Sequence, residues 1–383
     1  MISFFKKLIP VTLISLCFFG GAKISYAVES LLTFSTHFTA VVANTTYYLI
    51  PNHSDSSGSV NTNESITYFI APTDGRLQNL YIAGGEPGGS NTITATMRIE
   101  GVDTLLSAQL TGTTDRKLNS TTTIAVSAGQ KMSLKIVTSA ALGGAYYIVK
   151  ASVTFKPTNN RYAAVFATTA GNTTVNSGTY YYGLMGQLYS ATQSIARNLM
   201  PTSGKFGNFY FYRGTAPGAG TSETRTLQYN GTNSSIVATI SDTSNVGSDT
   251  THTQYVSATD LVGFAATHSG TPALTPSIWS ATFEPDVEGE SLMMLSENTP
   301  TNTAAYWGYT QGSDADWDSS QTWAINTHPP INYRIKKLYV NLGTAPGASK
   351  SWNFRVDNGY QVSSGVNCTI SDSETACNDT TNS

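Results

Sequence analysis

Charged residues, cysteine and histidine are all scarce in this chain, and no hydrophobic run is long enough to cross a membrane. Only 12% of the 383 residues are charged, and the sequence has three cysteines and five histidines. The apolar run at residues 8–19 falls well short of the roughly 20 residues that a transmembrane helix needs. No segment sustains the apolar period of a helix. These absences argue against a membrane-spanning or helical protein.

Glycine, tyrosine and small polar residues are abundant instead. The chain has 33 glycines and 21 tyrosines, and runs of Ser, Thr and Asn separate short apolar stretches. Thr and Tyr suit a pleated surface with one wet face better than they suit a helix. The composition therefore predicts an all-β, turn-rich extracellular protein.

The N-terminus has the form of a secretory signal peptide. Lys6 and Lys7 form a basic start, the short apolar run follows, and Ser25-Tyr26-Ala27 places small residues where a signal peptidase cleaves. We expect residues 1–27 to be removed and the mature chain to be secreted or displayed at the cell surface. An uncleaved anchor is the alternative, and the short apolar run disfavours it.

Removing residues 1–27 leaves 18 basic and 24 acidic residues, a formal charge of −6. No basic stripe for nucleic acid remains. Two cysteines also remain, Cys368 and Cys377, and an even count in an oxidising compartment favours a disulfide. They align with Ala238 and Gly247 of an earlier part of the chain, across an apparent hairpin, so we expect a cross-strand bridge.

The chain repeats one unit with a period the size of a domain. Gly214-Thr215-Ala216-Pro217-Gly218 recurs as Gly343-Thr344-Ala345-Pro346-Gly347, and the looser copy Gly84-Gly85-Glu86-Pro87-Gly88 precedes both. The three prolines are 130 and 129 residues apart. We therefore predict units at residues 28–157, 158–290 and 291–383. The Pro-Gly pair fits a type II turn, in which glycine takes a positive φ.

Each unit is predicted to be an antiparallel β-sandwich of the jelly-roll type. Seven to eight short strands in about 130 residues is the number expected of two packed sheets. The runs that alternate apolar and polar residues in the first unit are 46–50, 66–70, 77–82, 93–99, 124–126, 132–137 and 146–155.

The third unit is incomplete by comparison with the second. The second unit continues 36 residues beyond Asp249 of Ser248-Asp249-Thr250-Thr251 to Pro285, whereas only four residues follow Asp379 of the matching Asn378-Asp379-Thr380-Thr381. A sandwich that lacks its last strands exposes a sheet edge. Three interpretations stay open: a fragment of a longer array, an edge completed by a strand of another copy of the chain, or a poorly ordered last unit.

Two acidic stretches are candidates for calcium. Asp314, Asp316 and Asp318 alternate in a loop, but Ser319 and Ile325 stand where an EF-hand needs Gly and Glu. A looser calcium loop is one reading, and a solvated acidic turn is the other. The junction at residues 284–290 carries four carboxylates, which would either bind calcium or form a charged linker that keeps two units apart. No other cofactor is expected.

Four aromatic residues crowd the start of the third unit: Trp307, Tyr309, Trp317 and Trp323. Flat aromatic faces beside Asp and Asn suit a carbohydrate-binding surface, so a surface glycan is a candidate partner. Burial in a core or between domains is the more common position of tryptophan.

A catalytic site is not apparent. None of the histidines lies in a nucleophile elbow, at a zinc spacing or at a repeated position, and no pair of carboxylates stands out. A secreted hydrolase therefore ranks below a binding or structural role.

One stretch of the chain suggests a family. The order Leu-Tyr-Val-x-Leu, Gly-Thr-Ala-Pro-Gly-Ala, Asn-Gly, Cys-Thr-Ile-Ser, Cys-x-Asp-Thr-Thr-Asn covers residues 338–382, with weaker copies at 209–262 and 80–136. It resembles tandem β-sandwich repeats of secreted, surface and phage-type structural proteins of bacteria. The resemblance implies a structural or adhesive role and brings no catalytic residues. We expect a secreted or surface-displayed structural or adhesive protein, with carbohydrate binding as the alternative.

Overall fold

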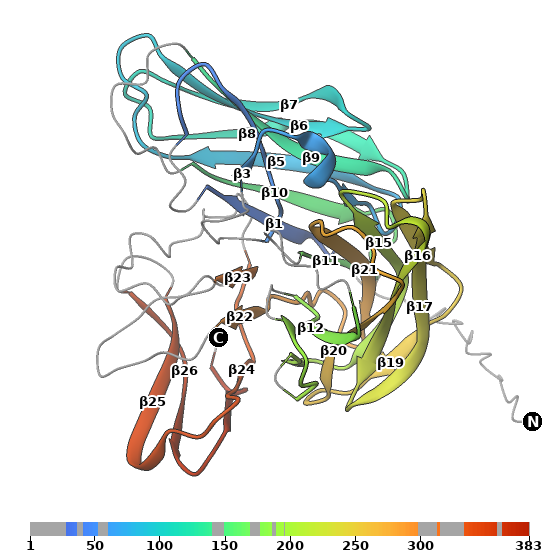
Figure 1. The fold of residues 1–383 in the computed structure, drawn as a ribbon. Helices are drawn as coiled ribbons and strands as arrows, with labels where there is room; N and C mark the ends of the chain where they lie inside the picture. Colours follow the sequence, from blue (N-terminus) through green and yellow to red (C-terminus); the bar gives the residue numbers. More distant parts are fainter. Residues whose placement is uncertain are drawn as a thin grey trace, which may run out of the picture.

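The computed structural model describes residues 28–36, 41–52, 60–139, 149–168, 177–185, 189–194, 196–297, 312–314, 333–357 and 362–382. Figure 1 shows their arrangement. Strands dominate this part of the chain, and the only helix in it is the 3₁₀ turn η1 (Glu64–Ile66). The predicted all-β class is confirmed. Residues 1–27, the predicted signal peptide, lie outside the described residues.

The first ten strands form two packed antiparallel sheets. One sheet has the order β1 (Ser30–Ser35), β10 (Lys150–Pro157), β5 (Gly75–Ala83), β8 (Arg116–Val126). The other has the order β3 (Val60–Asn61), β2 (Thr46–Leu49), β9 (Lys131–Thr138), β6 (Thr92–Ile99), β7 (Val102–Thr111), with β4 (Phe69–Ile70) also paired to β9. In β6 the buried residues Ile93, Ala95 and Met97 alternate with threonines, so one face of the strand enters the core. These strands form the first sandwich.

The next eleven strands repeat this topology. One sheet has the order β11 (Ala163–Thr168), β21 (Ser277–Pro285), β15 (Gly204–Arg213), β18 (Val246–Asp249), with β19 (Gln254–Val256) beside β15. The other has the order β13 (Tyr189–Ser190), β12 (Thr179–Gly183), β20 (Leu261–Ser269), β16 (Gly218–Tyr229), β17 (Thr232–Asp242), with β14 (Asn198–Leu199) beside β20. A second core of Phe, Trp, Leu and Ile side chains lies between these sheets. These strands form the second sandwich.

The last six strands form three separate pairs. The antiparallel pairs are β24 (Leu338–Asn341) with β27 (Ala376–Asp379) and β25 (Gly347–Asp357) with β26 (Ser363–Asp372). The third pair, β22 (Leu295–Glu297) with β23 (Gly312–Asp314), is parallel. We call the strands β24–β27 the third unit. Its strands β24, β25, β26 and β27 follow the order of β15, β16, β17 and β18 in the second sandwich.

Backbone conformation repeats along with the sequence. The glycine after each repeated proline has a positive φ, namely 78° at Gly88, 104° at Gly218 and 93° at Gly347, as the predicted type II turn requires. The hairpins between β6 and β7 and between β16 and β17 turn at Glu100-Gly101 and Asn230-Gly231, where all four φ values are positive, as in a type I′ turn.

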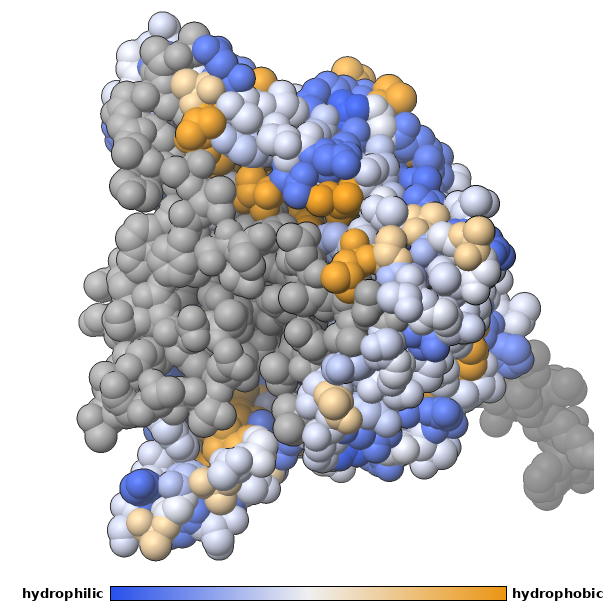
Figure 2. Space-filling model, viewed as in Figure 1, coloured by the Kyte–Doolittle hydropathy of each residue, from blue (hydrophilic) through white to orange (hydrophobic). Residues whose placement is uncertain are grey.

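On the face in Figure 2, most of the described residues are hydrophilic or of intermediate hydropathy. Hydrophobic residues, drawn in orange, form small separate patches among larger white and blue areas on this face. This distribution follows from the abundance of Thr, Ser, Gly and Asn in the sequence.

Candidate functional site

The aromatic residues predicted to bind sugar cannot be placed. Trp307, Tyr309, Trp317 and Trp323 lie outside the described residues, as do Asp316 and Asp318. Asp314 is the last residue of β23. Both the sugar site and the calcium loop therefore stay predictions. Among the side chains that the structure describes, no group of three or more potential metal ligands comes together.

The predicted disulfide between Cys368 and Cys377 is confirmed. It does not bridge a hairpin, however: Cys368 lies in β26 and Cys377 in β27, which pair with β25 and β24 respectively. The chain crosses from one sheet to the other between the two cysteines, so the bridge ties the two layers of the third unit together. At the equivalent position of the second sandwich, a Cβ on Gly247 would lie 2.7 Å from the Thr239 carbonyl oxygen.

The most extensive contact between units joins the first and second sandwiches. Strand β11, with the apolar sequence Ala-Ala-Val-Phe-Ala-Thr, is buried along its whole length because it has a sandwich on each side. Ala163, Val165 and Ala167 belong to the core of the second sandwich. Ala164 and Phe166, together with Ile278 of β21, belong to the core of the first.

Aromatic rings fix the centre of this joint. The Phe166 ring lies edge-on to Phe69 and to Phe155 of the first sandwich, with ring centres 5.7 and 5.8 Å apart. At the periphery, Tyr68 and Tyr212 meet edge-to-face at 5.9 Å. The Lys131 ammonium lies 5.7 and 5.6 Å from their ring centres. Such a cation between two tyrosine faces adds attraction to the packed area.

Among the described residues, at least four hydrogen bonds cross the same joint, each with a backbone group on one side. The Tyr212 hydroxyl donates to the Ser65 carbonyl oxygen at 2.5 Å and the Ser280 hydroxyl to the Ile70 carbonyl oxygen at 2.6 Å. The Asn52 amide donates to the Phe166 carbonyl oxygen at 2.8 Å, and Ala164 N–H donates to the Ser30 hydroxyl at 2.7 Å. Because backbone atoms take part, a shift of one strand would break the bonds. The joint therefore specifies one relative position of the two sandwiches.

A carboxylate of the predicted charged linker connects the second sandwich to the third unit. Buried Glu290 accepts hydrogen bonds from the Lys337 ammonium at 2.7 and 2.9 Å, forms an ion pair with Lys336 at 2.7 Å and accepts a bond from the Thr202 hydroxyl. Burial alone would raise the pKa of Glu290, but the hydrogen bonds from both lysines and Thr202 lower it. The expectation that these carboxylates keep the units apart is therefore wrong for Glu290.

A charged network is buried inside the second sandwich. Glu223 and Arg225 of β16 and Arg213 of β15 are all 0% exposed. Glu223 pairs with Arg213 and accepts a bond of 2.9 Å from the Arg225 Nε. The Arg225 guanidinium carbon lies 4.1, 4.7 and 4.8 Å from the ring centres of three side chains, namely Tyr182, Trp279 and Phe211. Aromatic faces therefore surround the Arg225 cation. The two guanidinium groups of the network carry two positive charges, and Glu223 supplies one negative charge.

Sequence reasoning missed this network because alternating charges in a strand usually face water. The sequence did carry a signal, since Glu223 and Arg225 stand 130 residues after Ile93 and Ala95. Those two residues lie in the core of the first sandwich.

No protein-family model matches the chain, and no curated protein shows significant sequence similarity to it. In the described part of the chain, no helix is both long and apolar enough to cross a membrane.

Proposed function

We propose that this protein is secreted or displayed on a cell surface, where its tandem sandwiches serve as a stiff structural or adhesive element. The observation that carries the proposal is the joint between the first and second sandwiches. Units joined by a flexible linker move independently. Here the shared core and four hydrogen bonds oppose such movement.

The energetics of the joint support a stiff arrangement. Separating the sandwiches would expose the Phe166 and Ile278 side chains, each only 1% exposed in the structure. Exposing one fully buried aromatic or aliphatic side chain costs about 1.5–3 kcal/mol. It would also leave the main-chain partners of Tyr212 and Ser280 to be satisfied by water. A stiff spacer that projects a surface away from the cell requires such a joint.

The joint can be tested with pairs of spin labels on the mature chain. Labels at Leu105→Cys in β7 and Val237→Cys in β17, two exposed positions, report the distance between the sandwiches. A single narrow distance distribution is expected for the parent protein, and Phe166→Ala should broaden it. Phe264→Ala, which removes a ring from the second core alone, should leave it narrow. A broad distribution in the parent protein would exclude a stiff element.

Secretion is tested with the same chain carrying a C-terminal tag in a bacterial host. Protein that begins at Val28 should be recovered outside the cytoplasm. Recovery of only the full-length chain inside the cell would contradict the proposed location.

A further inference from the structure

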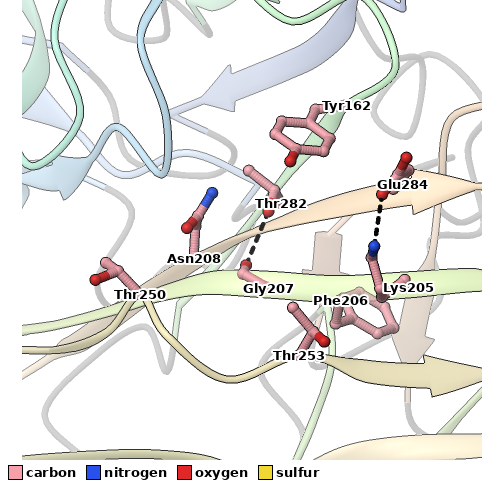
Figure 3. A pocket seen from close by; sticks show the side chains of 9 residues that line it. All are labelled: Tyr162, Lys205, Phe206, Gly207, Asn208, Thr250, Thr253, Thr282 and Glu284. Atoms are coloured by element: carbon pink, nitrogen blue, oxygen red, sulfur yellow. Dashed lines mark hydrogen bonds and ion pairs between the residues drawn. The ribbon is translucent and has the colours of Figure 1, made fainter.

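A polar depression of about 190 Å³ lies on the outer face of the β11-β21-β15-β18 sheet. It is not part of the joint described above. Figure 3 shows its lining: Tyr162 before β11; Lys205, Phe206, Gly207 and Asn208 of β15; Thr250 and Thr253 between β18 and β19; and Thr282 and Glu284 of β21.

The depression is open because β15 has a glycine at its centre. A Cβ at Gly207 would lie 3.3 Å from the Thr253 methyl group and 3.7 Å from the Thr282 hydroxyl, so any side chain there would occupy the space. The first sandwich has Gln78 at the equivalent position, and its amide donates to Glu29 at 3.1 Å. The hydrogen bond to the backbone of this position is the same in both sandwiches. The Thr282 hydroxyl donates to the Gly207 carbonyl oxygen at 2.9 Å, and the Thr154 hydroxyl donates to the Gln78 carbonyl oxygen at 3.1 Å.

The asparagine next to this position makes different hydrogen bonds in the two sandwiches. Asn79 and Asn208 both have a positive φ, 58° and 46°, at the same bulge of the sheet. Asn79 donates its side-chain amide to Thr154 at 3.2 Å. The Asn208 side chain has no hydrogen-bond partner among the described residues, although it lines the depression. Its amide can therefore both donate to and accept from a ligand.

Charge around the depression favours a neutral ligand. Glu284 forms ion pairs with Lys205 at 3.0 Å and with Arg161 at 2.6 Å. A metal cation would have to compete with both of these cations for the carboxylate, and a small anion would face the carboxylate itself. A hydroxyl group can donate to Glu284 while its neighbour accepts from Lys205. Vicinal hydroxyls of a sugar match this adjacent acceptor and donor, and bonds to charged groups are the stronger ones.

An aromatic ring completes the set of groups that a sugar needs. Figure 3 shows Tyr162 on the same side of β15 as Thr282 and Glu284, with Thr253 on the other side. A pyranose has one apolar C–H face, which packs on the face of an aromatic ring. We propose that this depression binds a pyranose residue of a neutral glycan. The inference deepens the adhesive part of the proposed function and rests on it for the source of the ligand, a surface polysaccharide.

The test begins with an array of neutral oligosaccharides and the mature chain, followed by titration calorimetry with the oligosaccharide that binds best. Gly207→Gln places the side chain of the first sandwich in the depression and should abolish detectable binding. Tyr162→Ala should weaken binding about tenfold, because it removes the stacking face. Gln78→Ala, the matched change in the first sandwich, should leave affinity unchanged. Unchanged thermal unfolding of each variant would establish that it is folded.

Two outcomes would overturn the proposal. One is the absence of binding to any neutral oligosaccharide. The other is binding that Gly207→Gln and Tyr162→Ala leave intact, which would place the ligand elsewhere, for example at the predicted Trp317 surface. Neither outcome affects the spin-label distances or the recovery of secreted protein, so the proposed structural function would stand or fall separately.

Discussion

Equivalent side chains at positions 119, 249 and 379 hold the same corner of each unit. Asp249 accepts from Val237 N–H at 3.0 Å and from Thr251 N–H at 3.2 Å. Asp379 repeats this arrangement with Asn367 and Thr381, at 3.0 and 3.1 Å. In the first sandwich Asn119 replaces the acid and donates its amide to the Ser107 carbonyl oxygen at 2.9 Å. The carboxylates are therefore structural, and they make the corner of the second and third units sensitive to acid.

The first prediction concerns Asp249. Burial would raise the pKa of this carboxyl, but hydrogen bonds from Val237, His252 and Thr251 lower it to about 2. Since the folded pKa lies below the unfolded one, the stabilisation is complete above about pH 4 and is lost as the pH falls toward 2. Asp249→Asn should lower the free energy of unfolding by about 2 kcal/mol at pH 7.

Urea unfolding of this variant at several pH values checks the prediction. The difference in the free energy of unfolding between the variant and the parent protein should vanish near pH 2. Glu288→Gln, at an exposed carboxyl, should show no such dependence. A difference that is the same at pH 7 and pH 2 would show that the charge of Asp249 does not matter.

The second prediction concerns the buried network of Arg213, Glu223 and Arg225. Burial lowers the pKa of Arg225 to about 10, so its charged form is held at a cost. Glu223→Gln leaves two guanidinium groups without a counter-charge and should lower the free energy of unfolding by about 3–5 kcal/mol. The triple change Arg213→Met, Glu223→Leu, Arg225→Met should match or exceed the parent protein in chemical denaturation. A triple variant that is less stable than the parent protein would mean that the charges stabilise the core.

Sequence could not reveal this network from the second unit alone. Glu223 and Arg225 alternate with threonines, as in a strand with a charged wet face. Only the aligned core residues Ile93 and Ala95 indicate that this face is buried. Likewise, Gly207 by itself indicates only a residue that is unfavourable in a strand. Comparison with Gln78, at the equivalent position of the first sandwich, shows that the second sandwich lacks a side chain there. The candidate sites therefore depend on differences between copies and on contacts that the fold alone brings about.

At the level of elements, apolar strands were predicted and polar ones were not. The expected strand at 77–82 lies within β5, and that at 132–137 lies within β9. The sequence prediction omitted β7 and most of β8, because their many exposed polar residues mask the alternation. The run 66–70 was expected as one strand, but it begins with the end of η1 and only Phe69–Ile70 pairs. The alternation of apolar and polar residues reflects the burial of one face of a strand, and an edge strand has little buried surface.

A prediction for the third unit follows from its bridge between two layers. The double change Cys368→Ala and Cys377→Gly introduces the residue types that the second sandwich has at the equivalent positions, Ala238 and Gly247. The loss of the bridge should lower the local unfolding free energy of β24–β27 by about 2–3 kcal/mol. Hydrogen exchange should show faster exchange in these strands and no change in β16. Equal protection with and without the bridge would show that packing alone holds the layers.

For the whole molecule, the repeat was visible in the sequence but the contact between copies was not. A period of 130 residues gives the length of a unit, but it does not indicate which faces of neighbouring units pack together. The apolar run of β11 was the available signal, because a strand buried on one face only would alternate. The shared core arises from residues such as Phe69 and Phe166, which are far apart in the sequence.

The joint between sandwiches uses different surfaces on its two sides. In the first sandwich β4 lies against β15 of the second, and in the second sandwich β14 lies against β24 of the third unit. Since β14 is equivalent to β4 and β24 to β15, the contact is head-to-tail and is used twice. A contact of this kind does not close on itself as a two-fold dimer does. Successive units would be related by a constant rotation and translation, so an array built this way is a polar, screw-like filament whose two ends differ.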